Sequence, residues 1–360
     1  MFEFHVAPLF KITNRHFRVF LRQFTHCATL WTEMISSEDL LKCQSADKLL
    51  AFDKIEHKII CQLGGNNAKN FAQAAKLVEK HNYDGININA GCPSTKIATN
   101  NMGIDLLGKP ELIADIVAEV NSATKYCTSV KTRIGINENS GGKWLKNKFE
   151  IAFPKNQNKK TLVVIHARTA MSSGIGPKEN RSIPPIEYDK AIEIANTRTD
   201  LDFVINGNIT TLEEALHFKE LTRDNSDQPL FVGVMLGRAA SRNPCMLAHV
   251  DKLFYGKNPP STVKSRKTVL EGYLAYIKKL EQVEPSSQPS TRLLLIPIMP
   301  LFYNTFFKSK YNQIVENHIL KYSKTKIRTS EILRLIIDQV DAQCAELFNK
   351  NLISSDPNEE

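Results

Sequence analysis

The chain has 360 residues, a mass of 40.6 kDa and a formal net charge of +9 at pH 7. This length fits one large domain of about 250 residues with a smaller one of about 100. Hydrophobic residues make up 42% and charged residues 24% of the chain, which is ordinary globular usage. The composition therefore excludes a disordered, collagen-like or coiled-coil protein.

The positive charge is unevenly distributed along the chain. Residues 1–255 carry +5, residues 256–345 carry +7 and residues 346–360 carry −3. A short basic segment beside a larger and nearly balanced one is typical of a module that docks on a polyanion. Charge alone is equally compatible with a basic surface that has no dedicated partner.

The seven cysteines are odd in number and scattered, with no CxxC pair and no Cys/His cluster at metal-ligand spacing. We therefore expect neither a structural zinc nor a disulfide framework. No apolar run reaches the roughly 18 residues of a membrane span, and the N-terminus lacks a signal-peptide pattern. We expect a cytoplasmic monomer with no metal and no membrane partner, while an organellar form made from a longer precursor stays open.

Eight short apolar runs, rich in Val, Ile and Phe, recur before residue 240 and predict β-strands. Segments with helical periodicity lie between them, such as 67–82 and 109–124. This alternation predicts a parallel sheet, and eight units favour a closed (β/α)8 TIM barrel. An open doubly wound sheet would need a glycine-rich turn after the first strand, and residues 6–13 contain no glycine. The strands are predicted at 2–7, 29–34, 58–63, 85–89, 128–132, 161–166, 201–206 and 231–236.

The domain organisation follows from where this alternation stops. The predicted barrel occupies residues 1–255, and the Pro-containing stretch 256–262 is typical of a linker. Residues 263–345 carry helical patterns and predict a small helical domain. Residues 346–360 are expected to form a disordered tail.

Reactive side chains lie at most of the predicted strand ends, which face the active site in a barrel. Gln62, Lys131 and His166 have donors suited to the polar edge of a bound ring, and Lys131 can hold negative charge on a reduced cofactor. Cys92 lies in a Gly-Cys-Pro turn where a thiol can react or deliver a proton, although a lone Cys is more often a buried small hydrophobe. Glycines after the last two strands, with Arg238, predict a phosphate site.

Nine motifs occur in an order that resembles the tRNA-dihydrouridine synthases. The likeness covers residues 5–255 and is strongest to the bacterial A-type subfamily, for which VKTRIGI followed later by PKENR is characteristic. The motifs are APLF (7–10), TEM (32–34), QLGG (62–65), GININAGCPS (85–94), VKTRIG (130–135), IHAR (165–168), GIGPKENRSIPP (174–185), ING (205–207) and LGRAASRNP (236–244).

This resemblance implies an FMN-binding barrel followed by a helical tRNA-binding domain. It implies reduction of the C5=C6 bond of uridine in the tRNA D-loop, at positions 20 and 20a. NADPH would reduce FMN, the flavin N5 would give hydride to C6, and Cys92 would protonate C5. The residues implied to hold FMN are Pro8, Leu9, Gln62, Lys131, His166, Asn206, Gly207, Asn208, Gly237 and Arg238. Those implied to lie near the RNA are Asn89, Arg168, Lys178 and Arg181.

The chain departs from the family pattern at several positions. Leu9 stands where Met is usual and keeps an apolar wall. Asn208 replaces the second glycine of the usual NGG, and Asn is among the few side chains that tolerate a positive φ. The segments 95–108 and 137–160 are diverged, which bears on rate and on which uridine is modified.

Two other functions remain open from the sequence. An FMN barrel oxidoreductase acting on a free pyrimidine or enone would leave the PKENR segment and the basic helical domain without a purpose. A catalytically idle tRNA-binding protein would be expected to have lost Cys92, Lys131 or His166, and all three are present. Phosphate contacts in the helical domain are expected from Lys308, Lys310, Lys321, Lys324, Lys326 and Arg328.

Overall fold

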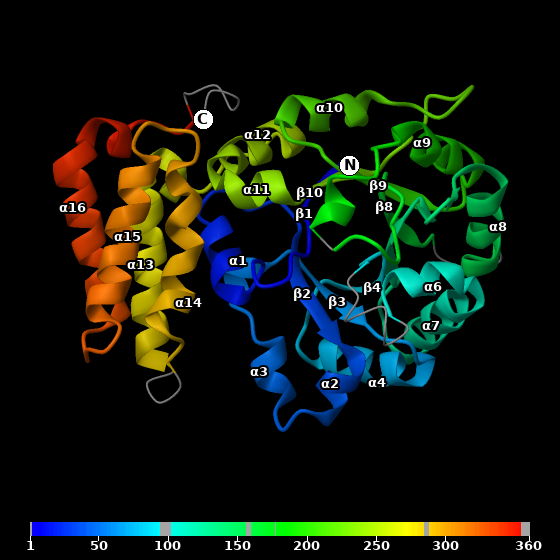
Figure 1. The fold of residues 1–360 in the computed structure, drawn as a ribbon, viewed down its shortest axis with the longest axis horizontal. Coiled ribbons are helices and arrows are strands. Elements are labelled where there is room, and N and C mark those ends of the chain that lie inside the picture. The colour runs from blue at the N-terminus through cyan, green and yellow to red at the C-terminus, as the bar shows by residue number, and fades with distance from the viewer. Residues whose placement is uncertain (1, 94–101, 156–159, 177, 284–287, 354–360) are drawn as a thin grey trace. The chain divides into compact units, whose positions relative to one another are not determined.

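The computed structural model describes residues 2–93, 102–155, 160–176, 178–283 and 288–353 (Figure 1). The chain forms two compact units. Unit 1 comprises Met1–Phe10, Thr29–Phe52 and His57–Leu236, and unit 2 comprises Lys11–Ala28, Asp53–Glu56 and Gly237–Glu360.

Unit 1 is built on eight parallel strands that curl into a barrel. Their order is β1-β10-β9-β8-β5-β4-β3-β2. The Thr29 N–H donates to the Phe4 carbonyl at 2.8 Å and the Val6 N–H donates to the Thr29 carbonyl at 2.9 Å, so β1 also meets the residue before β2. The predicted TIM-type barrel is confirmed. The strands are β1 (Glu3–Val6), β2 (Leu30–Ser36), β3 (Ile59–Gly64), β4 (Gly85–Ala90), β5 (Ser129–Arg133), β8 (Leu162–His166), β9 (Asp202–Asn206) and β10 (Gly233–Leu236).

Helices alternate with these strands along unit 1. The two helices singled out from periodicity are present as α4 and α7, and local signals set where they start. The Asn67 side chain caps α4 by accepting the Asn70 N–H at 3.0 Å, and Pro110 occupies the first position of α7. The helices are α2 (Ser37–Lys42), α3 (Ala46–Leu50), α4 (Ala68–Lys80), α6 (Ile104–Gly108), α7 (Pro110–Ala123), α8 (Gly142–Ala152), α9 (Tyr188–Thr197) and α10 (Leu212–Glu220), with a 3₁₀ turn at Glu179–Arg181.

The diverged segment after β5 contains structure that the sequence pattern did not predict. A small antiparallel pair joins β6 (Gly135–Ile136) to β7 (Asn139–Ser140), and α8 follows it. Strands of two residues are too short to show a period, so only the structure reveals them. Asn137 takes a φ of +54° at the turn of this hairpin, a conformation that Asn tolerates.

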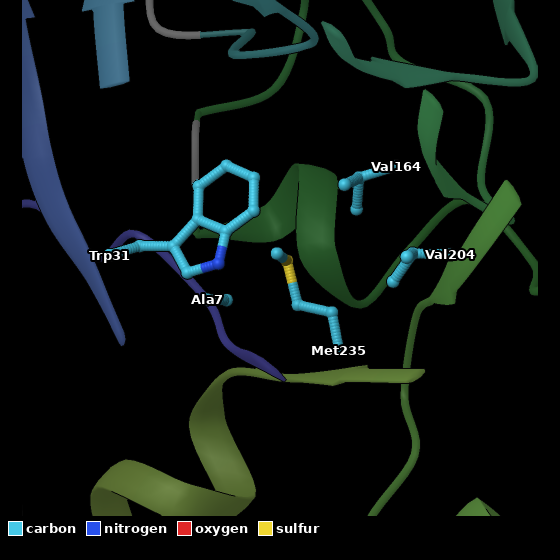
Figure 2. Packing of buried hydrophobic residues seen from close by; sticks show 5 residues of the cluster. All are labelled: Ala7, Trp31, Val164, Val204 and Met235. Atoms are coloured by element: carbon cyan, nitrogen blue, oxygen red, sulfur yellow. The ribbon is translucent and has the colours of Figure 1, made fainter. Parts of the chain in front are cut away.

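Apolar side chains fill the barrel interior below the strand ends. Ala7, Trp31, Val164, Val204 and Met235 form one buried cluster (Figure 2). Because side chains two residues apart on a strand share a face, the residues two positions beyond Val164 and Val204 lie on this same inner face, one layer closer to the C-terminal strand ends. The polar residues of the barrel mouth therefore lie directly above this buried apolar layer.

Unit 2 is largely helical, as the segment 263–345 predicted. Helices α13, α15 and α16 pack side by side (Figure 1). The stretch IPIMPLF forms 3₁₀ turns instead of α-helix, because its prolines lack an N–H to donate. The elements are α1 (Arg15–Leu21), 3₁₀ turns at Lys54–Glu56, Pro244–His249, Ser261–Lys264 and Ile296–Phe302, and helices α11 (Arg238–Arg242), α12 (Val250–Tyr255), α13 (Arg266–Val283), α14 (Thr291–Leu295), α15 (Lys308–Tyr322) and α16 (Thr329–Asn349).

The compact units do not follow the division of the chain at residue 255. Two early segments belong to unit 2, and buried polar contacts tie them there. The Arg18 and Glu56 side chains form a buried ion pair at 2.5 Å. The Asp251 carboxylate accepts the N–H of His26 at 2.7 Å and that of Cys27 at 3.1 Å. Such partners are far apart in sequence, so no local pattern indicates them.

Packing in unit 2 also extends into the segments expected to be linker and tail. Within 256–262, Thr262 Oγ1 donates to the Gln23 carbonyl at 2.8 Å. Beyond residue 345, α16 continues to Asn349, and Phe348 and Leu352 are buried. Ordered structure therefore reaches past the expected domain end, while 354–360 lie outside the described residues.

Candidate active site

Three amide side chains on β3 and β4 hold one another in place. Gln62 Nε2 donates to Asn87 Oδ1 at 2.8 Å, and Asn89 Nδ2 donates to Gln62 Oε1 at 3.0 Å. Asn87 in turn donates to Ser129 Oγ on β5 at 3.0 Å. All three amides are buried. Buried and fully oriented, they form a rigid polar wall with few ways to rearrange.

Asn89 also fixes the turn that carries Cys92. Its Oδ1 accepts the N–H of Gly91 at 3.2 Å and that of Cys92 at 3.1 Å. A Cβ on Gly91 would lie 3.2 Å from the Thr132 backbone, so this close approach favours glycine. The Cys92 side chain remains partly exposed. The Cys92 thiol therefore lies at the barrel mouth on a turn whose backbone is fixed by the Asn89 side chain and packed against the Thr132 backbone.

Lys131 lies beside this turn, since it pairs in register with Asn89 across β4 and β5. Its Nζ donates to Asn206 Oδ1 at 3.1 Å, and Asn206 donates to the Met235 carbonyl at 2.7 Å. Desolvation of the ammonium lowers the Lys131 pKa to about 7, and the Arg133 cation acts in the same direction. Part of the side chain is still accessible to solvent. A pKa this close to neutral makes the charge of Lys131 sensitive to any group that binds beside it.

Gly207 provides a close approach at the end of β9. Its φ of +129° is a conformation that favours glycine, and an added Cβ would lie 2.9 Å from Cδ2 of His166. The Tyr188 hydroxyl donates to its carbonyl. The next residue, Asn208, stands where the family pattern has glycine. Its φ is +49°, a backbone conformation that Asn tolerates.

The segment 168–183 follows β8 and carries the PKENR motif, and we call it the PKENR loop. Lys178 and Arg181 are exposed on it, whereas Arg168 is buried and its Nη1 donates to the Ser182 carbonyl at 3.2 Å. The resemblance implied that Arg168 lies near the RNA. In the structure this Arg168 hydrogen bond is made within the protein, to the carbonyl of a loop residue.

The remaining candidate residues fall in two places. Pro8 and Leu9 follow β1 in unit 1 and are partly exposed. Gly237 and Arg238 come directly after β10 in the chain, but they belong to unit 2, where they begin α11. Ser94, which closes the GCPS motif, lies outside the described residues.

Two site residues were missed by sequence reasoning, although both lie in motifs that it used. Arg133 is the Arg of VKTRIG and Asn180 is the Asn of PKENR. Both are buried, with several bonds to backbone carbonyls. A polar residue at the end of a strand or in a polar loop gives no signal of burial in sequence, so only the structure shows that Arg133 and Asn180 are buried.

A (β/α)8 barrel with a thiol, amides and a lysine of lowered pKa at its C-terminal mouth is the arrangement of a barrel enzyme. The family model described as "Dihydrouridine synthase (Dus)" matches residues 5–343. The chain belongs to the dihydrouridine synthase family.

Relatives from several bacteria share this family. The tRNA-dihydrouridine(20/20a) synthase of Shewanella oneidensis is 37% identical over 281 residues, covering 78% of this chain and 79% of the relative. The protein of the same name from Pseudomonas putida is 38% identical over 275 residues, covering 76% and 77%. Among solved structures, an old yellow enzyme homologue from Zymomonas mobilis aligns with a TM-score of 0.48 and 14% identity, covering 75% of this chain and 92% of that one.

No helix in the described part of the chain is long and apolar enough to cross a membrane. Among the described residues, no three His, Cys, Asp or Glu side chains gather in a way that could hold a metal ion.

Proposed function

We propose that this protein reduces the C5=C6 bond of uridine in the tRNA D-loop to 5,6-dihydrouridine, at positions 20 and 20a, with FMN as cofactor and NADPH as reductant. Membership of the family and the names of the relatives support the reaction and the substrate. The observation that carries the proposal is the Asn89 side chain, which holds the Cys92 turn beside Lys131.

The residues of the barrel mouth fit a flavin. Donors and acceptors from Gln62, Lys131 and Asn206 face the barrel interior, as a polar ring edge requires. Gly207 lets the His166 ring lie close against its backbone, since an added Cβ would lie 2.9 Å from His166 Cδ2. We assign Pro8 and Leu9 to the apolar side of the ring. Asn208, Gly237 and Arg238, with Gly207, are assigned to the phosphate. When bound, the flavin supplies the hydride that reduces C6 of uracil.

Cys92 is assigned the proton that completes the reduction. Addition of hydride at C6 leaves negative charge across C5 and O4, so a proton must reach C5. A protonated thiol can donate this proton to carbon as a general acid. Asn89 holds the backbone of the donor, and the nearby Lys131 ammonium stabilises negative charge as it develops.

RNA contacts are assigned to two exposed basic regions. Lys178 and Arg181 lie on the PKENR loop of unit 1. The helical domain of unit 2, residues 263–345, supplies the lysines and arginine at 308, 310, 321, 324, 326 and 328, all exposed. The target base must leave the RNA stack at a cost of a few kcal/mol, and phosphate contacts offset that cost. Action as a monomer on cytoplasmic tRNA is part of the same proposal.

The half-reactions separate this proposal from its competitors. The FMN-loaded protein is mixed with NADPH without oxygen, and the loss of visible flavin absorbance is followed. Unmodified tRNA or free uridine is then added to matched samples. We expect rapid reoxidation by tRNA and none by uridine over the same time. Equal rates with both would support an enzyme of free pyrimidines, and no reoxidation by tRNA would overturn the proposal.

A further inference from the structure

Asn180 is a buried residue in an otherwise exposed and charged motif. Its Oδ1 accepts the Met171 N–H at 2.7 Å, and its Nδ2 donates to the Met171 carbonyl at 2.9 Å and to the Ile175 carbonyl at 3.3 Å. One side chain therefore ties the motif to the earlier part of the PKENR loop, at Met171 and Ile175. The flanking Lys178 and Arg181 are turned outward by the same arrangement.

Arg133 joins this loop to the Cys92 turn. Its Nε donates to the Gly91 carbonyl at 3.0 Å, while Nη1 donates to the carbonyls of Thr169 and Asn180, each at 3.1 Å. The three carbonyls belong to the Cys92 turn, to the start of the PKENR loop and to its motif. Because guanidinium donors lie in one fixed plane, the positions of these carbonyls are linked through a rigid group.

The charge of Arg133 is retained despite its burial. Desolvation lowers its pKa to about 10, which leaves it protonated at neutral pH. No carboxylate within the described ranges forms an ion pair with it. A buried cation that loses a hydrogen-bond acceptor carries a large desolvation cost. The three hydrogen bonds from Arg133 to carbonyls are therefore expected to form and break as one set.

We propose that Arg133 and Asn180 are positioning residues that couple the PKENR loop to the Cys92 turn. When Lys178 and Arg181 engage RNA phosphates, any shift of the loop moves the Asn180 carbonyl. The guanidinium transmits that shift to Gly91, which immediately precedes Cys92. The thiol is thereby aligned when RNA is seated. This inference rests on the proposed function for the identity of the RNA and of the proton donor.

Two variants and a matched control test the coupling. Arg133→Lys keeps the charge and loses the planar set of donors. Asn180→Ala removes the three side-chain bonds that hold the loop and leaves Arg133 unchanged. The control is Asn137→Gly. The Asn137 side chain accepts the Ser172 N–H at 2.9 Å on the same loop and forms no hydrogen bond with Arg133 in the described part of the chain. The φ of Asn137 is positive, a conformation that glycine adopts freely.

The first readout needs no turnover. Each FMN-loaded protein is treated with iodoacetamide, and alkylation of Cys92 is followed by mass spectrometry of its peptide. Both variants should change the Cys92 alkylation rate by about tenfold or more, while Asn137→Gly stays within about twofold of the unchanged protein. An unchanged rate in both variants would overturn the proposal.

The second readout splits the reaction. Flavin reduction by NADPH should proceed at the unchanged rate in every variant, whereas reoxidation by saturating tRNA should slow by about 10- to 100-fold in Arg133→Lys and Asn180→Ala only. An equal slowing in Asn137→Gly would show a general need for loop stability and contradict the coupling. If tRNA fails to reoxidise the unchanged protein, the proposed function fails, while the alkylation comparison still decides whether loop and turn are coupled.

Discussion

The barrel mouth of unit 1 and the basic residues of unit 2 hold polar groups in opposite ways. At the mouth, Gln62 and Asn89 are buried, and each uses both ends of its amide on protein partners. In unit 2, Lys324, Lys326 and Arg328 are exposed, and none forms an ion pair with any residue that the structure describes. The side chains of the mouth are held in position by the protein itself before a substrate binds. The exposed basic side chains take up fixed positions only through what they bind.

This contrast sets the size and form of the effects that substitutions should have. Side chains held by several hydrogen bonds contribute to the reaction by their exact position, so one substitution at the mouth should block a step of the reaction. Exposed cations act through screened charge, so each should contribute a small and salt-dependent part of RNA affinity.

The largest effect is expected from Cys92→Ala. Loss of the proton donor should slow tRNA-dependent reoxidation of the reduced flavin by about 10² to 10⁴-fold, while NADPH reduces the flavin at the unchanged rate. Stopped-flow absorbance measures both steps. Cys127→Ala, at an exposed thiol, is the control and should leave both unchanged. Full reoxidation in Cys92→Ala would remove this residue from the mechanism.

Gly207→Ala should damage the mouth through the backbone. The φ of +129° disfavours a side chain, and the new Cβ would meet the His166 ring at 2.9 Å. Urea unfolding should show a loss of about 2 kcal/mol together with lower flavin occupancy. Gly142→Ala is the matched control, since its φ is +48° and nothing lies within 4 Å of its Cβ. An equal loss in both variants would argue against close packing at Gly207.

Lys131 should make the mouth sensitive to pH. The pKa of Lys131 in the folded protein, about 7, lies below its ordinary value of 10.5. Burial of the charged lysine therefore lowers the stability of the fold by its full amount below pH 7, and this loss of stability falls to zero as the pH rises to 10.5. A ring acceptor of the flavin that takes a hydrogen bond from the ammonium favours the protonated form of Lys131. FMN affinity should therefore be highest below pH 7 and should weaken above it.

Fluorescence titration with FMN on either side of pH 7 measures this dependence. Lys131→Arg keeps a permanent charge and should flatten the change that the unchanged protein shows. An identical pH dependence in Lys131→Arg would assign the titration to another group.

The smallest effects are expected in unit 2. Lys324→Ala, Lys326→Ala and Arg328→Ala should each weaken tRNA binding a few-fold and reduce the slope of log K against log salt by about 0.7 to 0.9. Lys219→Ala, at an exposed lysine on α10 of unit 1, is the control. Filter binding at several salt concentrations measures the slopes. Unchanged slopes in all three variants would place the RNA elsewhere.

The barrel and the Cys92 turn were predictable because their determinants are local. Strands buried on both faces appear as short apolar runs, and the reactive residues of a barrel follow the strand ends directly. The sequence also showed that Asn208 tolerates a positive φ, and the structure gives it one. These features depend on a few adjacent positions.

Contacts between distant segments were not predictable from one sequence. The Arg18–Glu56 ion pair assigns early segments to unit 2, and no periodicity marks either residue. The same holds for Arg133, whose partners are Gly91 in the Cys92 turn and Thr169 and Asn180 in the PKENR loop. A motif shows that such a residue is present, but its bonds appear only when the chain is folded.

The central claim is tested most directly by mapping the product. Unmodified tRNA is incubated with the FMN-loaded protein and NADPH, and dihydrouridine is located at single-nucleotide resolution. We predict reduction confined to positions 20 and 20a, absent with Cys92→Ala and absent without NADPH. Dihydrouridine at other D-loop positions would correct the assigned site, and its absence from the tRNA would contradict the account.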